Sequence, residues 1–304
     1  RLAESLDAMQ SGTKEDEEIK VLHRHPSSLN GLINHPTIIL GEGNTITLWY
    51  LPGALASCIQ VRVCLIWLSL TNPILHFDSH RSWHTTQEYF KDGENIFGCL
   101  EYSPARHMLG HATLNDIPGV SKALAGDASC QWSKDICLPS AILSGVLSII
   151  HPSLYDAGSL AMHHLNDWAA AHDSQMAAAL ANKRIVTLAN WSTVFTNVSV
   201  IVNRSTPLHR DPHSQSDWYD LLVSVGKYDD CALHIPTLGI QVLYTPGTII
   251  AFSGHLLQHS VNEVDGVRCC LAYYMRDNIH HWLRVPHPLH WVTPDHVRNT
   301  LLLQ

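Results

Sequence analysis

The 304-residue sequence contains no long hydrophobic run, and its most apolar segment, residues 59–70, is interrupted by Gln60 and Arg62. A transmembrane helix needs about 20 predominantly apolar residues, so we expect no membrane association. The first twenty residues are polar and charged, so we expect no secretory signal. Because 45% of the residues are hydrophobic and 15% are charged, the composition indicates a globular protein rather than a disordered one.

The sequence also lacks paired cysteines and a positive charge excess. Its eight cysteines form no C-x-x-C motif, so a zinc ribbon is not indicated and we expect reduced thiols. The formal charge of −8 counts against a broadly basic, nucleic-acid-binding surface, although a local basic surface can exist on an acidic protein. A glycine-rich loop and a D-F-G motif are absent, and Ser216 stands where a kinase catalytic loop has Asn. The H-R-D sequence at residues 209–211 therefore does not indicate a protein kinase.

Two histidines and one carboxylate have the spacing of a metal site. His209 and Asp211 form an H-x-D pair, His259 follows 48 residues after Asp211, and Arg268 follows 9 residues later. Two histidines and one carboxylate can hold one face of Fe(II) and leave the opposite positions open. An arginine binds a carboxylate through two parallel hydrogen bonds and is always charged. The pattern predicts a dioxygenase that uses Fe(II), 2-oxoglutarate and O2.

The surrounding sequence favours this H-x-D pair over a second one at His76 and Asp78. Residues 221–225, 238–244, 248–252 and 267–274 read as strands, and Thr245-Pro246-Gly247 reads as a turn between two of them. This order is typical of a double-stranded β-helix, the jelly-roll barrel. We predict an α+β protein with a support region over residues 1–183, made of an N-terminal arm, strands and helices. The jelly-roll catalytic core follows over residues 184–304.

Two prolines mark helix starts in the support region. Pro139 and Pro152 each occupy a position suited to the first turn of a helix, and residues 157–180 are rich in alanine, which favours helix. Residues 44–51 and 61–66 are rich in β-branched residues, and this composition predicts two strands around a turn at Pro52-Gly53.

Longer motifs carry a resemblance to a known family. In order along the chain, the motifs are Trp49 to Gly53, Asn203 to Asp211, Asp217 to Leu222, Tyr244 to Ile249, Ser253-Gly254 and Tyr273 to Asp277. They resemble the TET/JBP family of 2-oxoglutarate- and Fe(II)-dependent nucleic-acid dioxygenases, specifically its branch in mushroom-type fungi. The dense resemblance covers residues 184–282.

The resemblance implies oxidation of 5-methylcytosine in DNA to its hydroxymethyl, formyl and carboxyl forms. His209, Asp211 and His259 would bind iron. Arg268 and Arg204 would bind 2-oxoglutarate. The family often has a hydroxyl residue two positions after the distal arginine, where this chain has Cys270, a weaker hydrogen-bond donor.

A base inside a duplex cannot reach a buried metal, so we expect base flipping. Asp277 could accept a hydrogen bond from the cytosine amino group, but it could equally pair with Arg276 or cap a helix. Ser214, Asn203 and Trp218 are further candidates for substrate contact. We expect DNA with methylated bases as the partner, a monomer, and nuclear localisation inferred from that substrate. N-demethylation of N6-methyladenine and hydroxylation of a protein or small molecule remain alternatives.

Overall fold

A computed structural model of the chain describes residues 31–68, 84, 86–91, 97–107, 116–124, 132, 134–180, 191–211, 214–288 and 291–302. Two features of the sequence analysis lie outside these residues: residues 1–30 of the N-terminal arm and the second H-x-D pair at His76 and Asp78. Every structural statement below concerns the described residues.

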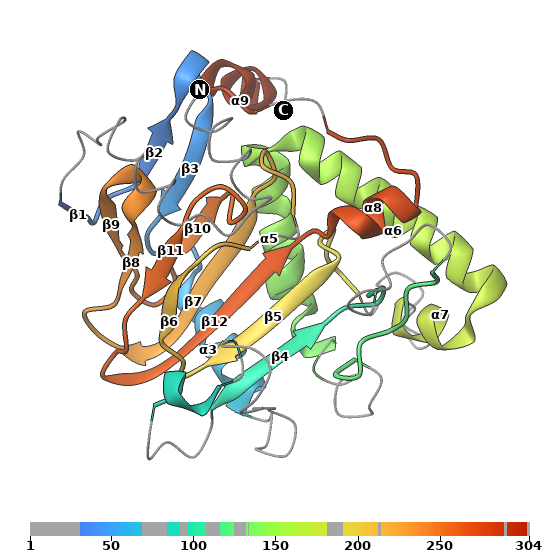
Figure 1. Cartoon of the computed structure of the whole chain (residues 1–304), viewed down its shortest axis with the longest axis horizontal. Coiled ribbons are helices and arrows are strands. Elements are labelled where there is room, and N and C mark those ends of the chain that lie inside the picture. The colour runs from blue at the N-terminus through green and yellow to red at the C-terminus, as the bar shows by residue number, and fades with distance from the viewer. Residues whose placement is uncertain are drawn as a thin grey trace.

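The larger of two sheets is antiparallel throughout and joins distant parts of the chain (Figure 1). Its strands in spatial order are β2 (Thr37–Leu40), β3 (Ile46–Leu51), β10 (Ile249–Phe252), β7 (Asp220–Tyr228), β12 (Gly266–Tyr274), β5 (Asn197–Val202) and β4 (Gly98–Tyr102). The strands before residue 184 thus pair with those after it. The domain boundary predicted there stays a prediction, since residues 181–190 are not described.

The smaller sheet faces the larger one. Its strands in spatial order are β1 (Leu32–Ile33), β9 (Ile240–Leu243), β8 (Ala232–Ile235), β11 (His259–Val261) and β6 (Thr206–His209). Apart from the parallel pair β1–β9, its strands are antiparallel. The two sheets form the jelly-roll sandwich that the sequence predicted.

The alternation of side chains along each strand divides the core into two layers. On β12, Leu271 and Tyr273 pack on the outer face of the larger sheet, whereas Cys270 packs toward the smaller sheet. On β7, Val223 likewise faces outward and Leu222 inward. The outer layer also includes side chains of the helices, so one face of the larger sheet is covered by helices and the other by strands.

Two helices cover most of that outer face. They are α5 (Cys137–Ile150) and α6 (Pro152–His172), and α7 (Ser174–Leu180) follows them. Pro152 occupies the first turn of α6, as predicted. Two further helices, α8 (Asp277–Trp282) and α9 (Pro294–Leu302), follow the last strand, together with short 3-10 turns at Glu42–Asn44, Gln87–Tyr89 and Pro236–Leu238. None of the described helices combines the length and the apolar character that a membrane crossing requires.

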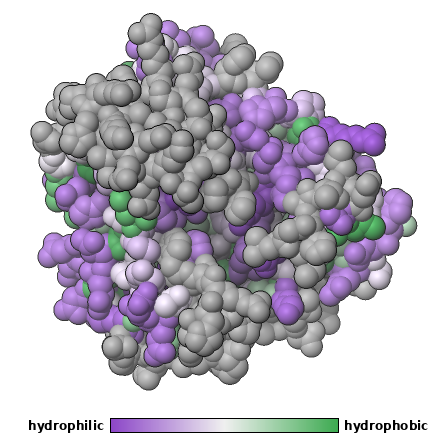
Figure 2. Space-filling view, in the orientation of Figure 1, coloured by the Kyte–Doolittle hydropathy of each residue, from purple (hydrophilic) through white to green (hydrophobic). Residues whose placement is uncertain are grey.

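The strand predicted at residues 61–66 is wrong, because this segment belongs to helix α3 (Ser57–Leu68). Val63 is buried in the outer core layer, whereas its neighbours Val61 and Arg62 are exposed. β-Propensity is strongly context-dependent, and contact with the larger sheet outweighs it here. Among the residues coloured by hydropathy in Figure 2, most are hydrophilic and the hydrophobic patches are small.

The burial of His280 on α8 should make the stability of the protein depend on pH. His280 is 2% exposed, and its ring centroid lies 4.7 Å from that of Trp218. Burial is the main cause that lowers the pKa of His280 from 6.5 to about 4; Asp277 opposes this shift and His287 adds to it. The unfolded chain therefore takes up a proton first as the pH falls, and the folded state loses stability between pH 6.5 and about 4.

We expect His280→Phe to flatten the pH dependence of the free energy of unfolding. The slope contributed by one such group approaches about 1.4 kcal/mol per pH unit inside this window. Urea unfolding of the metal-free protein from about pH 7 to about pH 5 measures it. His163→Gln is the control, because His163 is 71% exposed on α6. If the free energy of unfolding depended on pH equally in His280→Phe and in the unmodified protein, His280 would not be the source of this pH dependence.

Candidate metal centre

The two histidines of the predicted triad face each other across one pair of strands. β6 and β11 are antiparallel neighbours, and His209 lies directly opposite His259 in their register. The register shifts immediately after His259, which indicates a bulge or irregularity at that point. The imidazole centroids are 4.1 Å apart. The hydrogen bonding of the smaller sheet therefore sets the separation of the two rings.

The third residue, Asp211, follows β6 and is held by its backbone. Its N–H donates to the carbonyl of Gly254 at 2.9 Å. Its carboxylate oxygens lie 3.7 Å from Nε2 of His209 and 3.6 Å from Nε2 of His259. The ligand atoms of the three residues all lie within 4.8 Å of one another, close enough to hold a metal ion together.

Backbone carbonyls fix the tautomers of both histidines. Nδ1 of His209 lies 2.9 Å from the carbonyl of Pro207 and 3.1 Å from that of His259. Nδ1 of His259 lies 3.1 Å from the carbonyl of Leu257. A carbonyl only accepts, so both Nδ1 atoms must donate. Each Nε2 then keeps its lone pair and points toward Asp211, an arrangement that metal-binding histidines commonly adopt.

The electrostatics of the site favour the protonation states that bind metal. Burial and, to a smaller extent, the neighbouring His259 lower the pKa of His209 to about 4. Burial also lowers the pKa of His259. For Asp211, burial opposes ionisation, but the two imidazoles outweigh it and hold the carboxyl pKa below its ordinary value. Neutral imidazoles and an ionised carboxylate are the forms that coordinate metal.

The donor set fits a metal that uses two histidines and one carboxylate. The histidine side chains are 11% and 5% exposed, whereas that of Asp211 is 44% exposed. Two buried ligands beside an accessible one leave a side from which co-substrate could approach. The three residues therefore suit Fe(II), which keeps open positions in such sites.

Gly254 supports the triad because it leaves space for two carboxyl groups. A Cβ atom at this position would lie 2.5 Å from Oδ2 of Asp220 and 3.0 Å from Oδ2 of Asp211. We expect Gly254→Ala to displace Asp211 and to lower metal affinity about 10- to 100-fold, the range typical of changes beside a ligand. Titration with Co(II), followed by absorbance, measures this. Gly145→Ala on α5 meets open space and should bind as the unmodified protein does. Equal affinities for the two variants would contradict the role of Gly254.

The predicted distal arginine is buried beside the hydroxyl group of Ser224 and the ring of Tyr244. Arg268 is 4% exposed, its Nε donates to Oγ of Ser224 at 3.1 Å, and its guanidinium carbon lies 4.9 Å from the centre of the Tyr244 ring. The hydroxyl of Tyr228 donates to the same Ser224 oxygen at 2.6 Å. Within the described part of the chain Arg268 forms no salt bridge, so a bound carboxylate would meet its two terminal nitrogens.

Arg204 and Cys270 lie near Arg268. Arg204 is 6% exposed and donates from Nη1 to the carbonyl of His84 at 2.9 Å. Burial lowers the pKa of Arg204, and Arg268 lowers it further. Two guanidinium groups that repel each other favour an anion between them. The thiol of Cys270 lies 3.5 Å from the Tyr244 hydroxyl, and its proposed contact with 2-oxoglutarate stays a prediction.

The predicted substrate residues differ in their surroundings. Asn203 accepts from the N–H of Arg268 at 2.9 Å, so it positions the backbone of that arginine. Ser214 is 7% exposed, and its hydroxyl has no partner among the described residues. Trp218 is 1% exposed and packed against His280, so a base could stack on it only after this packing opened. Asp277 is the first residue of α8, where its charge affects His280.

The sequence reasoning missed a polar group that lies beside the triad. Arg276 and His84 both lie close enough to Asp211 for their charges to lower its pKa, after the effects of burial and of the two triad histidines. Arg276 lies over the Tyr274 ring at 4.7 Å and pairs with Glu101 at 3.5 Å. Asp220 is also close, since burial and the Asp211 charge raise its pKa well above the ordinary value. Side chains two positions apart share one face of a strand. Counting in steps of two from Arg268 along β12 reaches Tyr274 and then Arg276, so alternation would have identified both.

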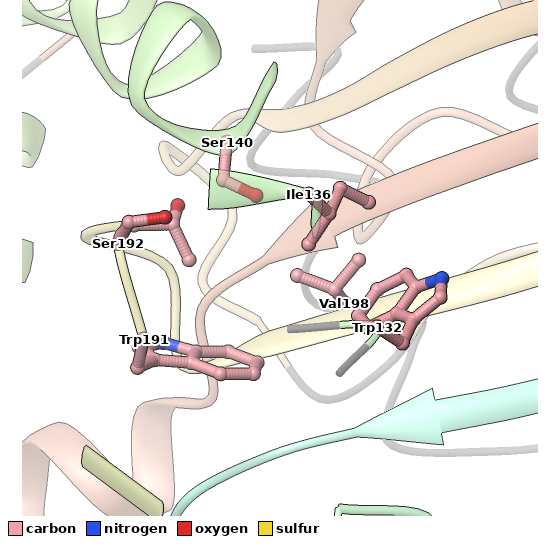
Figure 3. Close-up of a pocket in the computed structure, with 7 residues that line it drawn as sticks. Trp132, Ile136, Ser140, Trp191, Ser192 and Val198 are labelled. Atoms are coloured by element: carbon pink, nitrogen blue, oxygen red, sulfur yellow. The ribbon is translucent and has the colours of Figure 1, made fainter. Parts of the chain in front are cut away.

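A small pocket lies on the other side of the larger sheet, near the start of α5 (Figure 3). Its lining residues are Trp132, Ile136, Ser140, Trp191, Ser192, Thr193 and Val198. Val198 faces the helical layer, and no charged side chain lines the pocket. The pocket therefore belongs to the support side of the fold and not to the triad.

The chain is similar to known oxygenases in both sequence and fold. The family model Tet_JBP, described as the oxygenase domain of the 2OGFeDO superfamily, matches residues 122–277, about half of the chain. The solved structure of Naegleria NgTET1 in complex with 5mC DNA has a TM-score of 0.50 and 13% identity, covering 91% of this chain and 89% of that one. It therefore shows the same fold.

Two further solved structures give weaker matches. That of OsALKBH1 has a TM-score of 0.33 and 12% identity, covering 78% of this chain and 100% of that one. A viral collagen prolyl hydroxylase from Paramecium bursaria Chlorella virus-1 has a TM-score of 0.21 and 18% identity, covering 26% and 53%. Among curated protein sequences, no match is found.

Proposed function

Because the chain belongs to the TET/JBP family, the oxygenase domain of the 2OGFeDO superfamily, we propose that it oxidises 5-methylcytosine in DNA. Fe(II), 2-oxoglutarate and O2 are the metal and co-substrates of this superfamily. The proposal adds the substrate to the reaction class. Its products would be 5-hydroxymethyl-, 5-formyl- and 5-carboxylcytosine, since each product except the last keeps an oxidisable C–H bond.

The observation that carries the reaction class is the convergence of three ligand atoms with fixed tautomers. Nε2 of His209, Nε2 of His259 and the carboxylate of Asp211 would hold Fe(II). Bound Fe(II), together with 2-oxoglutarate and O2, supplies the oxidant for a C–H bond and releases succinate and CO2. Arg268 would bind the far carboxylate of 2-oxoglutarate through a charged, bidentate contact, and Arg204 would help to hold the co-substrate; both side chains are buried.

The polar group beside the triad supports a base as substrate. Arg276 offers N–H donors to the acceptor atoms of a pyrimidine, and the carboxylate of Glu101 can accept from an exocyclic amino group. The guanidinium carbon of Arg276 lies 4.7 Å from the centre of the Tyr274 ring, which holds its N–H donors in place. A flipped base would meet these groups along its hydrogen-bonding edge. The name of the solved Naegleria complex, which contains 5mC DNA, agrees with this substrate.

Two other substrates use the same metal centre. In N6-methyladenine, oxidation of the N-methyl group gives a hydroxymethylamine that loses formaldehyde, so the product would be adenine. A hydroxylated protein or small molecule is the other alternative, which the formal charge of −8 would suit. Nuclear localisation and a monomeric state follow from the proposed substrate and fold and stay predictions.

The test incubates the protein with Fe(II), 2-oxoglutarate, ascorbate and duplex oligonucleotides that carry 5-methylcytosine or N6-methyladenine. Mass spectrometry of the nucleosides reads the products. Oxidised cytosines that disappear in His209→Ala would support the proposal, and loss of the adenine methyl group would establish the demethylase. Succinate formation without change to either base would reject DNA oxidation and favour the other alternative. Lys134→Ala, a surface change outside the site, is the matched control.

A further inference from the structure

We propose that Arg106 binds a phosphate of the DNA backbone, at the outer end of a charged row formed by Arg276, Glu101 and Arg106. The row begins beside the triad and ends at the surface. This inference rests on the proposed function, because it takes nucleic acid as the substrate. It assigns a backbone contact, which sequence reasoning alone did not provide.

Glu101 is the centre of the charged row. It lies on β4, where its carboxylate accepts from Nδ2 of Asn197 at 2.7 Å. Its Oε1 lies 3.5 Å from Nη2 of Arg276, and its Oε2 lies 3.8 Å from Nη1 of Arg106. Burial opposes ionisation of Glu101, but Arg276 and Arg106 outweigh it and hold the carboxyl pKa below its ordinary value. The row therefore carries two positive charges and one negative charge.

The side chain of Arg106 makes fewer and longer contacts than that of Arg276. Arg276 is anchored by its backbone N–H, which donates to Oγ1 of Thr196 at 2.9 Å, and by its contact with Tyr274. The 3.8 Å approach of Arg106 to Glu101 is an ion pair without a hydrogen bond, since such bonds are shorter than about 3.2 Å. The Arg106 side chain is 46% exposed. Glu101 thus restrains this guanidinium, whose donors can still meet an anion from solvent.

The backbone around Arg106 is fixed. Its N–H donates to the carbonyl of Gly119 at 2.8 Å, and the N–H of Gly119 donates back at 3.0 Å. Next to this pair, the N–H of Ser121 donates to the carbonyl of Ser103 at 2.9 Å. Lys122 follows and is exposed. A second cation therefore lies on the same small element, which suits a polyanion better than a single small anion.

Two other surface cations of the described residues have closer acidic partners. Lys91 lies 3.3 Å from Asp265, and Arg298 lies 3.0 Å from Asp295. Each of these pairs is neutral by itself. The charged row instead keeps a net positive charge in a chain whose formal charge is −8. Guanidinium groups bind phosphate oxygens through two parallel hydrogen bonds, and Arg106 is connected to the triad through Glu101 and Arg276, whose charge lowers the pKa of Asp211.

The test measures binding of an unmethylated fluorescent duplex by anisotropy over a series of salt concentrations. We expect Arg106→Ala to weaken binding about 5- to 10-fold at low salt and Arg106→Glu to weaken it further. The slope of log affinity against log salt should fall by about 0.9 for the lost contact. Arg106→Lys keeps the charge and should restore most of the affinity. Melting temperatures of all variants check that they remain folded.

Arg298→Ala is the matched control, since it removes one exposed arginine on α9, at the opposite end of the molecule from β4 (Figure 1). Unchanged affinity and salt slope in Arg106→Ala and Arg106→Glu would overturn the inference and leave the proposed oxidation standing. Failure of the unmodified protein to bind any duplex would overturn both. If the unmodified protein binds the duplex, the Arg106 variants bind it more weakly and no base is oxidised, the result would support the phosphate contact and reject the proposed reaction.

Discussion

Asp211→Asn is expected to lower base oxidation by at least about a thousandfold, equivalent to about 4 kcal/mol in the activation barrier. Asparagine preserves the shape of the side chain but removes the negative charge that lies between two Nε2 atoms. The remaining histidines would bind a divalent ion weakly and without a fixed third donor. Nucleoside mass spectrometry measures the product, and Co(II) titration measures the accompanying loss of metal affinity.

Asp295→Asn provides the control for this change. Asp295 is 82% exposed on α9 and pairs with Arg298, so its replacement should leave product formation and metal affinity unchanged. Product formation by Asp211→Asn at the level of Asp295→Asn would show that the triad does not hold the catalytic metal.

The second large effect is expected at Arg268. Lysine keeps the positive charge but replaces a planar fork by a single ammonium group. We expect Arg268→Lys to raise the KM for 2-oxoglutarate about 100-fold, because the loss of a buried, paired contact costs about 2–5 kcal/mol. The rate of succinate formation, measured over a range of 2-oxoglutarate concentrations, gives this value.

Arg298→Lys makes the same substitution on the surface and should leave the KM unchanged. An unchanged KM in Arg268→Lys, accompanied by weaker DNA binding, would reassign the Arg268 pocket from co-substrate to substrate. The two variants therefore separate a pocket for a small dicarboxylate from one that serves the nucleic acid.

The sequence predicted the metal centre because its geometry is local to strands. His209 and Asp211 are separated by one residue, and the strands around His259 have a clear alternating pattern. Backbone pairing of β6 with β11 then brings the histidines together. Once the order of the strands is correct, this pairing fixes the positions of the three ligands, so residue types and spacing were sufficient to predict them.

The polar group beside the triad, which we propose as the substrate side, was less predictable because its residues come from separate strands. Glu101 lies on β4 and Asn197 on β5, and the two meet only because β4 is the edge neighbour of β5. Arg276 follows β12 at an even distance from Arg268, so the pleat places it on the inner side, whereas the sequence reasoning favoured Asp277. Alternation along the strand contained this information, but no motif marked it.

The helix α3 shows a different limit. Its β-branched residues favour an extended chain by propensity alone, yet the segment folds as a helix. To predict this helix, one must know which apolar face of the larger sheet it buries, and that face is assembled from strands that are distant in the sequence.

The pairing of His209 with His259 also bears on the order in which the protein matures. The two residues are 50 positions apart, and their contact closes a long loop of chain. A nascent or partly folded chain contains both imidazoles but not the chelating geometry. Iron can thus be captured tightly only after the smaller sheet has closed, and capture then stabilises the closed state by mass action. Metal loading would act as a late step of biogenesis that commits the polypeptide to its mature form.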